Sequence, residues 1–190
     1  MTTTGDTTRG PAWLYLIGGA LGLAAAIALT LEKIAKLRDP AYVPSCSINP
    51  VISCGSVMDS PQASAFGFPN PLIGIAAFAV VVTFGVVLLT GYTAPRWVWF
   101  GMQVGATFGV GFVHWLIFAS LYRIHALCPY CMVVWIVTIA TFWYTTLHNL
   151  RGTVFGGLVR RVHSGLLALW YVVVVVLVLQ AFWPYWSTVV

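Results

Sequence analysis

Five long runs of apolar residues, almost free of ionisable side chains, constrain this 190-residue chain more than any other feature. About 20 residues of helix, rising about 1.5 Å each, cross a hydrocarbon core about 30 Å thick. The runs are continuous rather than alternating, which favours helices over barrel strands, because a helix satisfies its own backbone groups in lipid. The predicted spans are Trp13–Leu31, Pro71–Thr90, Trp97–Ser120, Pro129–Leu147 and Gly165–Trp186.

The composition supports a membrane protein, since 60% of the residues are hydrophobic and only 7% are charged. Soluble domains carry about 25% charged residues. The sequence therefore predicts an all-α integral membrane protein with five transmembrane helices. We expect a disordered cytoplasmic tail (1–12), a four-helix bundle (13–148) with an outer loop (32–70), a cytoplasmic loop (149–163) and a fifth helix (164–190).

The basic residues that flank the spans predict the orientation in the plasma membrane. With a cytoplasmic N-terminus, the inner segments hold five basic residues, all arginines, against four in the outer segments, and the inner loop 149–163 has no acidic residue. Basic residues favour the cytoplasmic side. The net charge of +5 is then explained by contact with anionic membrane lipids, and no nucleic-acid partner is needed. The arginines are Arg9, Arg96, Arg151, Arg160 and Arg161.

Two of the four cysteines lie in the long polar segment between the first and second spans. Cys46 and Cys54 are eight positions apart, and the Asn49-Pro50 dipeptide between them favours a turn. A disulfide between the two cysteines is geometrically easy. The spacing leaves open whether such a bond is structural or transient.

The other two cysteines form a Cys-Pro-Tyr-Cys motif where the fourth span begins. We expect Cys128 at the helix N-cap, Pro129 at the first helical position and Cys131 at the third. The positive end of the helix dipole and the unpaired amides stabilise thiolates there, so thiol exchange is fast. Arg123 and His125 add positive charge just upstream.

Both cysteine pairs are predicted on the outer face, where oxidising conditions permit disulfides. Two inert structural disulfides would use the same residues, although a Cys-X-X-Cys ring is too small to stabilise a fold much. A zinc site of four thiolates is a further alternative, but one pair is too widely spaced and the other borders hydrocarbon, so no metal is predicted. Continuous disulfide formation needs an electron acceptor, and a membrane supplies dissolved quinone.

One ionisable side chain lies within a predicted span. His114 is in the third span, where such a residue is by default a candidate for function. We favour a neutral imidazole that is hydrogen-bonded to a neighbouring helix over a role in haem binding or proton transfer.

The arrangement of these residues resembles the vitamin K epoxide reductase family over about residues 13–148. The matching features are a Cys-X7-Cys pair in the first outer loop, Ser60 six positions later, "FGFPNPLIG" opening the next span, and Cys-X-X-Cys at a later span. The DsbB-type quinone-linked oxidases have the two pairs in the reverse order. The resemblance implies a four-helix bundle around a quinone pocket, with one peripheral helix.

The resemblance also implies roles for individual residues. Cys46 exchanges with a protein partner, Cys54 passes electrons to Cys128, and Cys131 faces the quinone. Asn70 matches a position that hydrogen-bonds a quinone oxygen, although an asparagine there is equally suited to capping a helix.

Two further residues are assigned to the quinone pocket. Ser60 matches a loop residue that lines it, and Trp135 stands where family members with a vitamin K role often carry tyrosine. An indole can still donate a hydrogen bond at that position.

The resemblance predicts a thiol-disulfide oxidoreductase that supports disulfide formation in exported proteins. Nothing thioredoxin-like follows Leu147, so the expected partner is a separate thioredoxin-fold (DsbA-like) protein outside the cytoplasm. The expected electron acceptor is a lipid quinone such as menaquinone, ubiquinone or a related vitamin K-type quinone. Epoxide reduction stays open, and the alternative is a membrane transporter or scaffold with structural disulfides.

Overall fold

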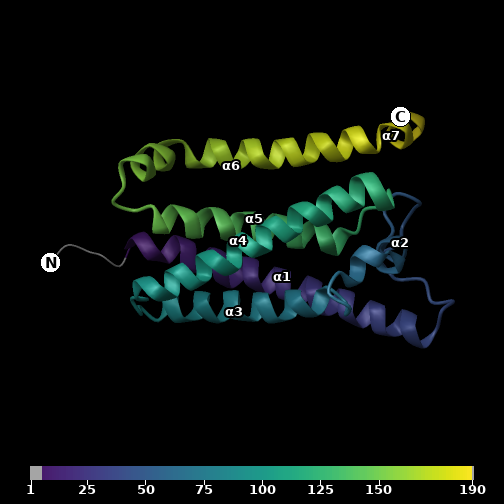
Figure 1. The fold of residues 1–190 in the computed structure, drawn as a ribbon, viewed down its shortest axis with the longest axis horizontal. Coiled ribbons are helices and arrows are strands. Elements are labelled where there is room, and N and C mark those ends of the chain that lie inside the picture. The colour runs from purple at the N-terminus through teal and green to yellow at the C-terminus, as the bar shows by residue number, and fades with distance from the viewer. Residues whose placement is uncertain (1–5, 190) are drawn as a thin grey trace.

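Five long helices lie side by side in the computed structural model, which describes residues 6–189 (Figure 1). All five are long and apolar enough to cross a membrane. The prediction of an all-α membrane protein with five spanning helices is therefore confirmed. The five are α1 (Asp6–Arg38), α3 (Pro71–Leu89), α4 (Arg96–Ala119), α5 (Pro129–Asn149) and α6 (Val154–Ala181).

Shorter elements gather at the end of the bundle opposite the N-terminus (Figure 1). They are α2 (Cys54–Asp59), the 3₁₀ turn η1 (Pro61–Ser64), the π-helical turn η2 (Ser120–Ile124) and α7 (Trp183–Val189). After η2, His125 has a φ of 55°, a left-handed conformation that ends the helix. The chain then turns back and enters α5.

Helix α1 packs against both α3 and α5, and α4 packs against α5. Small residues bring α1 and α3 close together, as is common in membranes, where packing rather than the hydrophobic effect drives helix association. A Cβ atom added at Gly85 of α3 would lie only 2.5 Å from the backbone nitrogen of Leu16. Gly85 therefore has to be glycine for these two helices to approach as they do.

Helix α6 runs along the edge of this group (Figure 1) and is held there by two hydrogen bonds. The Trp170 indole donates to Nε2 of His114 (3.0 Å), and the Tyr171 hydroxyl donates to the Ile136 carbonyl (2.8 Å). Nδ1 of His114 lies 2.7 Å from the Val110 carbonyl, which can only accept, so His114 is the neutral Nδ1–H tautomer. The neutral, hydrogen-bonded imidazole predicted within the third span is confirmed.

The ends of the helices differ from the sequence-based boundaries. Helix α1 begins at Asp6, so residues 6–12 are helical where a disordered tail was expected; residues 1–5 of that tail lie outside the described part. Helix α6 begins at Val154, capped by the Thr153 hydroxyl, so helix replaces most of the expected loop 149–163. The expected fifth span is interrupted at Phe182, where α6 gives way to α7.

Candidate active site

A short backbone pairing brings the two cysteine segments together. Ile52 and Leu127 form an isolated parallel bridge, in which Ser53 N donates to Leu127 O (2.9 Å) and Leu127 N donates to Val51 O (2.7 Å). The bridge aligns the residues that precede Cys54 with those that precede Cys128. It therefore determines which sulfur atoms meet.

The chain reaches this bridge through the turn at Asn49-Pro50. Oδ1 of Asn49 accepts hydrogen bonds from the backbone N–H groups of Val51 (3.0 Å) and Ile52 (2.7 Å). Asparagine side chains stabilise turns in this way. The turn predicted between Cys46 and Cys54 is confirmed.

Helix starts present Cys54 and Cys128. Cys54 is the first residue of α2, which the Ser53 hydroxyl caps by accepting from Ser56 N (3.2 Å). Cys128 is the N-cap residue of α5, with Pro129 directly after it, as predicted. Unpaired N–H groups at a helix start favour a negatively charged sulfur.

The four sulfur atoms form a continuous series at one end of the bundle. Cys46 and Cys54 are joined in a disulfide, whereas Cys128 and Cys131 are free thiols. The Sγ atoms of Cys54 and Cys128 are only 3.2 Å apart. Cys46, Cys54 and Cys128 are buried in one cluster and 6%, 0% and 1% exposed, so solvent is excluded from this contact. Among the described residues, no group of three or more His, Cys, Asp or Glu side chains could hold a metal ion.

The surroundings of Cys128 favour its thiolate form, which suits disulfide exchange. Its pKa is lowered, first because the Cys131 side chain hydrogen-bonds to it; burial opposes this shift, and the backbone N–H groups of Cys131 and Tyr130 add to it. The thiolate is the reactive form in disulfide exchange. A lowered pKa therefore favours the thiolate of Cys128, whose sulfur lies next to that of Cys54, and so favours exchange between these two residues.

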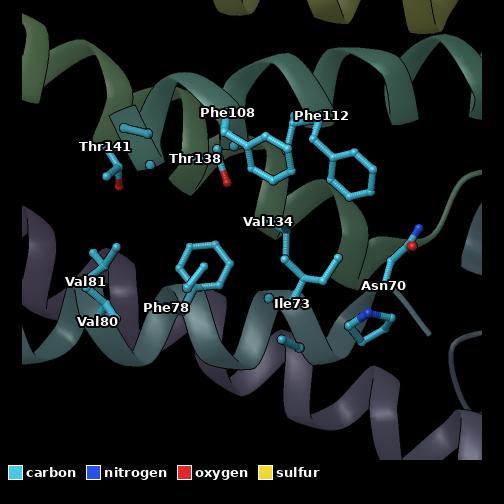
Figure 2. Close-up of a pocket in the computed structure, with 18 of the residues that line it drawn as sticks. Asn70, Ile73, Phe78, Val80, Val81, Phe108, Phe112, Val134, Thr138 and Thr141 are labelled. Carbon is cyan, nitrogen blue, oxygen red and sulfur yellow. The ribbon is translucent and has the colours of Figure 1, made fainter. Parts of the chain in front are cut away.

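A cavity of about 880 Å³ separates α3 from α4, and one wall of it is α5. It is lined almost entirely by apolar side chains and is open on one side. Figure 2 shows Phe108 and Phe112 of α4 facing Ile73 and Phe78 of α3, with Thr138 of α5 also pointing into the space. Its size and lining fit a hydrophobic ligand with a ring system.

Four of the residues singled out from the sequence line this cavity. They are Cys131, Ser60, Asn70 and Trp135. Cys54 and Cys128 do not line it. The Cys-X-X-Cys motif therefore has one sulfur on the loop disulfide and the other on the cavity, and it connects the two.

The polar atoms of these residues differ in their hydrogen bonds. The Trp135 indole is 4% exposed and its Nε1 has no hydrogen-bond partner in the protein. Asn70 is the N-cap residue of α3, but its side chain makes no capping hydrogen bond; its Oδ1 accepts from Ala65 N (3.0 Å) and its Nδ2 donates to Gln62 O (2.7 Å). A buried donor without a partner is costly, and Trp135 is one of the residues that line the cavity.

Ser60 and Thr141 are two further polar residues of the lining. The Ser60 hydroxyl donates to the Val57 carbonyl (2.7 Å) at the end of α2, so its proton is already used. Thr141 lies at the opposite end of the cavity from Asn70 (Figure 2), and its buried hydroxyl has no partner. Thr141 was not expected from the sequence, because a threonine in a helix usually bonds its own backbone.

The C-terminal end of α1 holds the segment that carries Cys46. The Glu32 carboxylate accepts a hydrogen bond from the Tyr42 hydroxyl (2.9 Å) and another from the Ser45 hydroxyl. Both donors lie in the stretch that leads to Cys46. Sequence reasoning missed this role, although the helix-forming residues after Leu31 indicated that α1 continues beyond the apolar run.

The same part of α1 also holds the helix that carries Cys54. Lys33 Nζ donates to the Met58 carbonyl (2.8 Å), and Lys36 forms an ion pair with Asp59. The Met58 carbonyl is at the negative end of α2, where a cation is favourable. One helix therefore positions both loop cysteines.

The fold and this site define a class of protein: a multi-pass membrane oxidoreductase whose chemistry is thiol–disulfide exchange. A comparison with known families agrees. The family model described as "Vitamin K epoxide reductase family" matches residues 13–146, more than half of the chain. The chain belongs to the vitamin K epoxide reductase family, and membership implies the use of a quinone. No curated protein matches the chain.

Proposed function

We propose that this protein reoxidises a thioredoxin-fold partner outside the cytoplasm and passes the electrons through two cysteine pairs to a lipid quinone. The observation that carries the proposal is the 3.2 Å contact between the Sγ atoms of Cys54 and Cys128, with Cys131 on the cavity. Sulfur atoms at this distance need little movement before exchange.

The first half of the cycle takes place at the cavity. The Cys128–Cys131 dithiol is oxidised to a disulfide, and its two electrons and two protons go to the quinone. Quinone supplies the oxidising power, because it accepts the two electrons and the two protons. Cys131 lies on the cavity side, so the electrons leave through this residue.

The second half transfers the disulfide to the loop. The Cys54 thiolate attacks Cys128 Sγ, which breaks the Cys128–Cys131 bond and leaves Cys131 reduced. Cys46 then attacks Cys54 and releases Cys128 with the bonding electron pair. The products are a Cys46–Cys54 disulfide and two free thiols at Cys128 and Cys131, which are the redox states in this structure.

The partner completes the cycle at Cys46. A thiolate of the reduced partner attacks Cys46 and releases Cys54, and the partner's second thiol then breaks the mixed disulfide. Cys46 is 6% exposed, so its segment must move before the partner can reach it. Val43 and Ile48, on either side of it, are 71% and 72% exposed and available for contact.

The cavity supports the choice of a quinone as electron acceptor. Its apolar lining suits a prenylated ring such as menaquinone or ubiquinone, and the indole of Trp135 can donate to a quinone oxygen. Ser60 and Asn70 lie in the same lining. Asn70 Nδ2 has a second hydrogen beyond the one given to Gln62, so it can also donate into the cavity.

The proposal places the cysteine end outside and the N-terminus in the cytoplasm of a cell whose plasma membrane holds the protein. Single cysteines introduced into a background with all four native cysteines changed to Ser test this orientation. An impermeant maleimide added to intact cells should label Val43→Cys, near the redox cysteines, and spare Thr93→Cys, in the α3–α4 connection. The reverse pattern would show that the orientation is wrong.

Substituting Cys131 tests the enzyme against a transporter or scaffold with structural disulfides. Under the proposal, Cys131→Ala abolishes quinone reduction that is driven by a reduced thioredoxin-fold protein, while the Cys46–Cys54 disulfide remains. Met132→Leu, the next residue along α5, is the matched control and should retain activity. Unchanged quinone reduction by Cys131→Ala would reject the proposed relay.

A further inference from the structure

Phe182 is buried beside the redox site, although the helix that carries it to this position is not buried. Apart from Gly156 near its start, no described residue of α6 is buried, whereas Phe182, the next residue after the helix, is 5% exposed. Trp183, which follows, is 66% exposed. The side chain of Phe182 therefore points into the protein at the end of a helix whose side chains are exposed or half-buried.

The surroundings of Phe182 connect it to the cysteines. It belongs to the same buried cluster as Val51 and Leu127, the residues of the backbone pairing that sets Cys54 beside Cys128. Trp135 is in this cluster as well, and Cys131 packs against it. Phe182 therefore packs in a cluster that holds both the segment before Cys54 and the helix that carries Cys131.

The position of Phe182 along the bundle is fixed from within the membrane. The hydrogen bonds of Trp170 to His114 and of Tyr171 to the Ile136 carbonyl prevent α6 from sliding past α4 and α5. Helix α6 lies outside residues 13–146, the part that matches the family model. The support that α6 gives is thus a feature of this chain beyond the matched region.

We propose that Phe182 is a positioning residue for disulfide exchange. Phe182 packs in the same cluster as Val51 and Leu127, and it thereby stabilises the backbone pairing of residues 51–53 with Leu127, which keeps the sulfur of Cys54 next to the sulfur of Cys128. The inference deepens the proposed function and rests on it, because the exchange is one step of that relay. Loss of the phenyl ring leaves a cavity beside the pairing. A displacement on the order of 1 Å slows a reaction on the order of 100-fold, so we expect a loss of at least about tenfold.

The test uses the full chain with Cys46→Ser and Cys131→Ser, which leaves only Cys54 and Cys128. Glutathione disulfide oxidises these two thiols to a disulfide and is itself reduced to two glutathione molecules. The rate of bond formation is followed by gel mobility after alkylation. The step that matters is the second one, in which the free thiolate attacks the mixed disulfide between the other cysteine and glutathione and releases glutathione; the rate at which this mixed disulfide disappears reports how often the two sulfur atoms meet, and it does not depend on quinone.

We expect Phe182→Ala to form the Cys54–Cys128 bond at least about tenfold more slowly than the parent. Phe182→Leu should restore most of the rate, and Trp183→Ala, the exposed neighbour, should match the parent. Thermal unfolding of each variant shows whether it is folded, and Phe182→Val replaces Phe182→Ala if the latter is not. A folded Phe182→Ala or Phe182→Val protein that forms the bond at the parent rate would overturn the inference.

The result can be separated from a failure of the proposed function. Quinone reduction is measured on the chain with its native cysteines. If that chain forms no reduced quinone but Phe182 still controls the Cys54–Cys128 rate, the proposed function fails while the role of Phe182 holds. If quinone is reduced and Phe182→Ala leaves the exchange rate unchanged, the inference about Phe182 fails alone.

Discussion

The Sγ atom of Cys54 lies 3.2 Å from the Sγ atom of Cys128 while it is covalently bonded to the sulfur of Cys46. Cys54 is thus the residue through which the loop between α1 and α3 and the Cys-X-X-Cys motif are connected. Attack on Cys54 from one side gives the loop disulfide, and attack from the other gives a Cys54–Cys128 bond. The direction of electron flow then depends on which nucleophile is reduced.

The first prediction concerns this intermediate. In Cys46→Ser the sulfur that would release Cys128 is absent, so the Cys54–Cys128 disulfide should accumulate. We expect it to rise from undetectable to about half of the molecules, because Cys131 still competes for Cys128 with similar energy. Non-reducing electrophoresis and peptide mass spectrometry measure the bond. Its absence from Cys46→Ser, or a Cys54–Cys131 disulfide in its place, would contradict the order of transfer.

Much of the fold was predictable because lipid imposes simple rules on sequence. Apolar length alone locates five spans, and Cys128 with Pro129 marks a helix start by local chemistry. The limits of α1 were not predictable in this way. Beyond Leu31 its residues are charged, and that part of the helix is stabilised by contacts with distant loop residues rather than by hydropathy.

The reactive residues of the candidate site were predictable from the sequence, but the contacts that bring them together were not. The cysteine spacing and the resemblance indicate which residues react, and local turn chemistry indicates the bend at Asn49. The pairing of Ile52 with Leu127 joins segments that are far apart in the chain and has no local signal. The insertion of Phe182 likewise depends on where α6 comes to lie, which apolarity does not specify.

The second prediction concerns the acidity of Cys128. Its pKa is lowered chiefly by the hydrogen bond from the Cys131 side chain, while burial acts in the opposite direction. Removing that donor in Cys131→Ala should therefore raise the pKa, and the thiolate should be lost at higher pH than in the parent. Cys131→Ser retains a hydroxyl donor and should fall between the two.

The thiolate is measured by its ultraviolet absorbance as pH is lowered. Cys46 and Cys54 are changed to Ser in every protein, and the Cys128→Ser form serves as the blank. If Cys131→Ala retained its thiolate to lower pH than the parent, the hydrogen bond would not be the cause of the shift.

The third prediction concerns access to the loop disulfide. Glu32 accepts hydrogen bonds from Tyr42 and Ser45, which tie the Cys46 segment to α1. Glu32→Ala removes both bonds, so dithiothreitol should reduce the Cys46–Cys54 disulfide at least about five times faster, as expected for a loss of at least about 1 kcal/mol from two hydrogen bonds. Alkylation after timed reduction measures the rate.

Lys36→Ala is the matched control for Glu32. Lys36 is on the same part of α1 but pairs with Asp59 of α2, on the Cys54 side. Ion pairs near the surface contribute little, so its loss should leave the reduction rate nearly unchanged. Equal acceleration in the two variants would mean that α1 holds the loop as a whole and that Glu32 has no particular role.

The last prediction concerns Trp135, whose indole N–H is buried in the cavity wall without a partner. If this N–H donates to a quinone oxygen, Trp135→Phe loses one hydrogen bond worth about 0.5–1.5 kcal/mol, and the KM for quinone should rise about three- to tenfold. The melting temperature should change little from lost hydrogen bonding, since the indole makes none within the protein. Trp143→Phe is the matched control, because its Nε1 is also buried without a partner but Trp143 does not line the cavity. A rise in KM for both variants would point to a general loosening of α5, and a rise for neither would remove Trp135 from the quinone site.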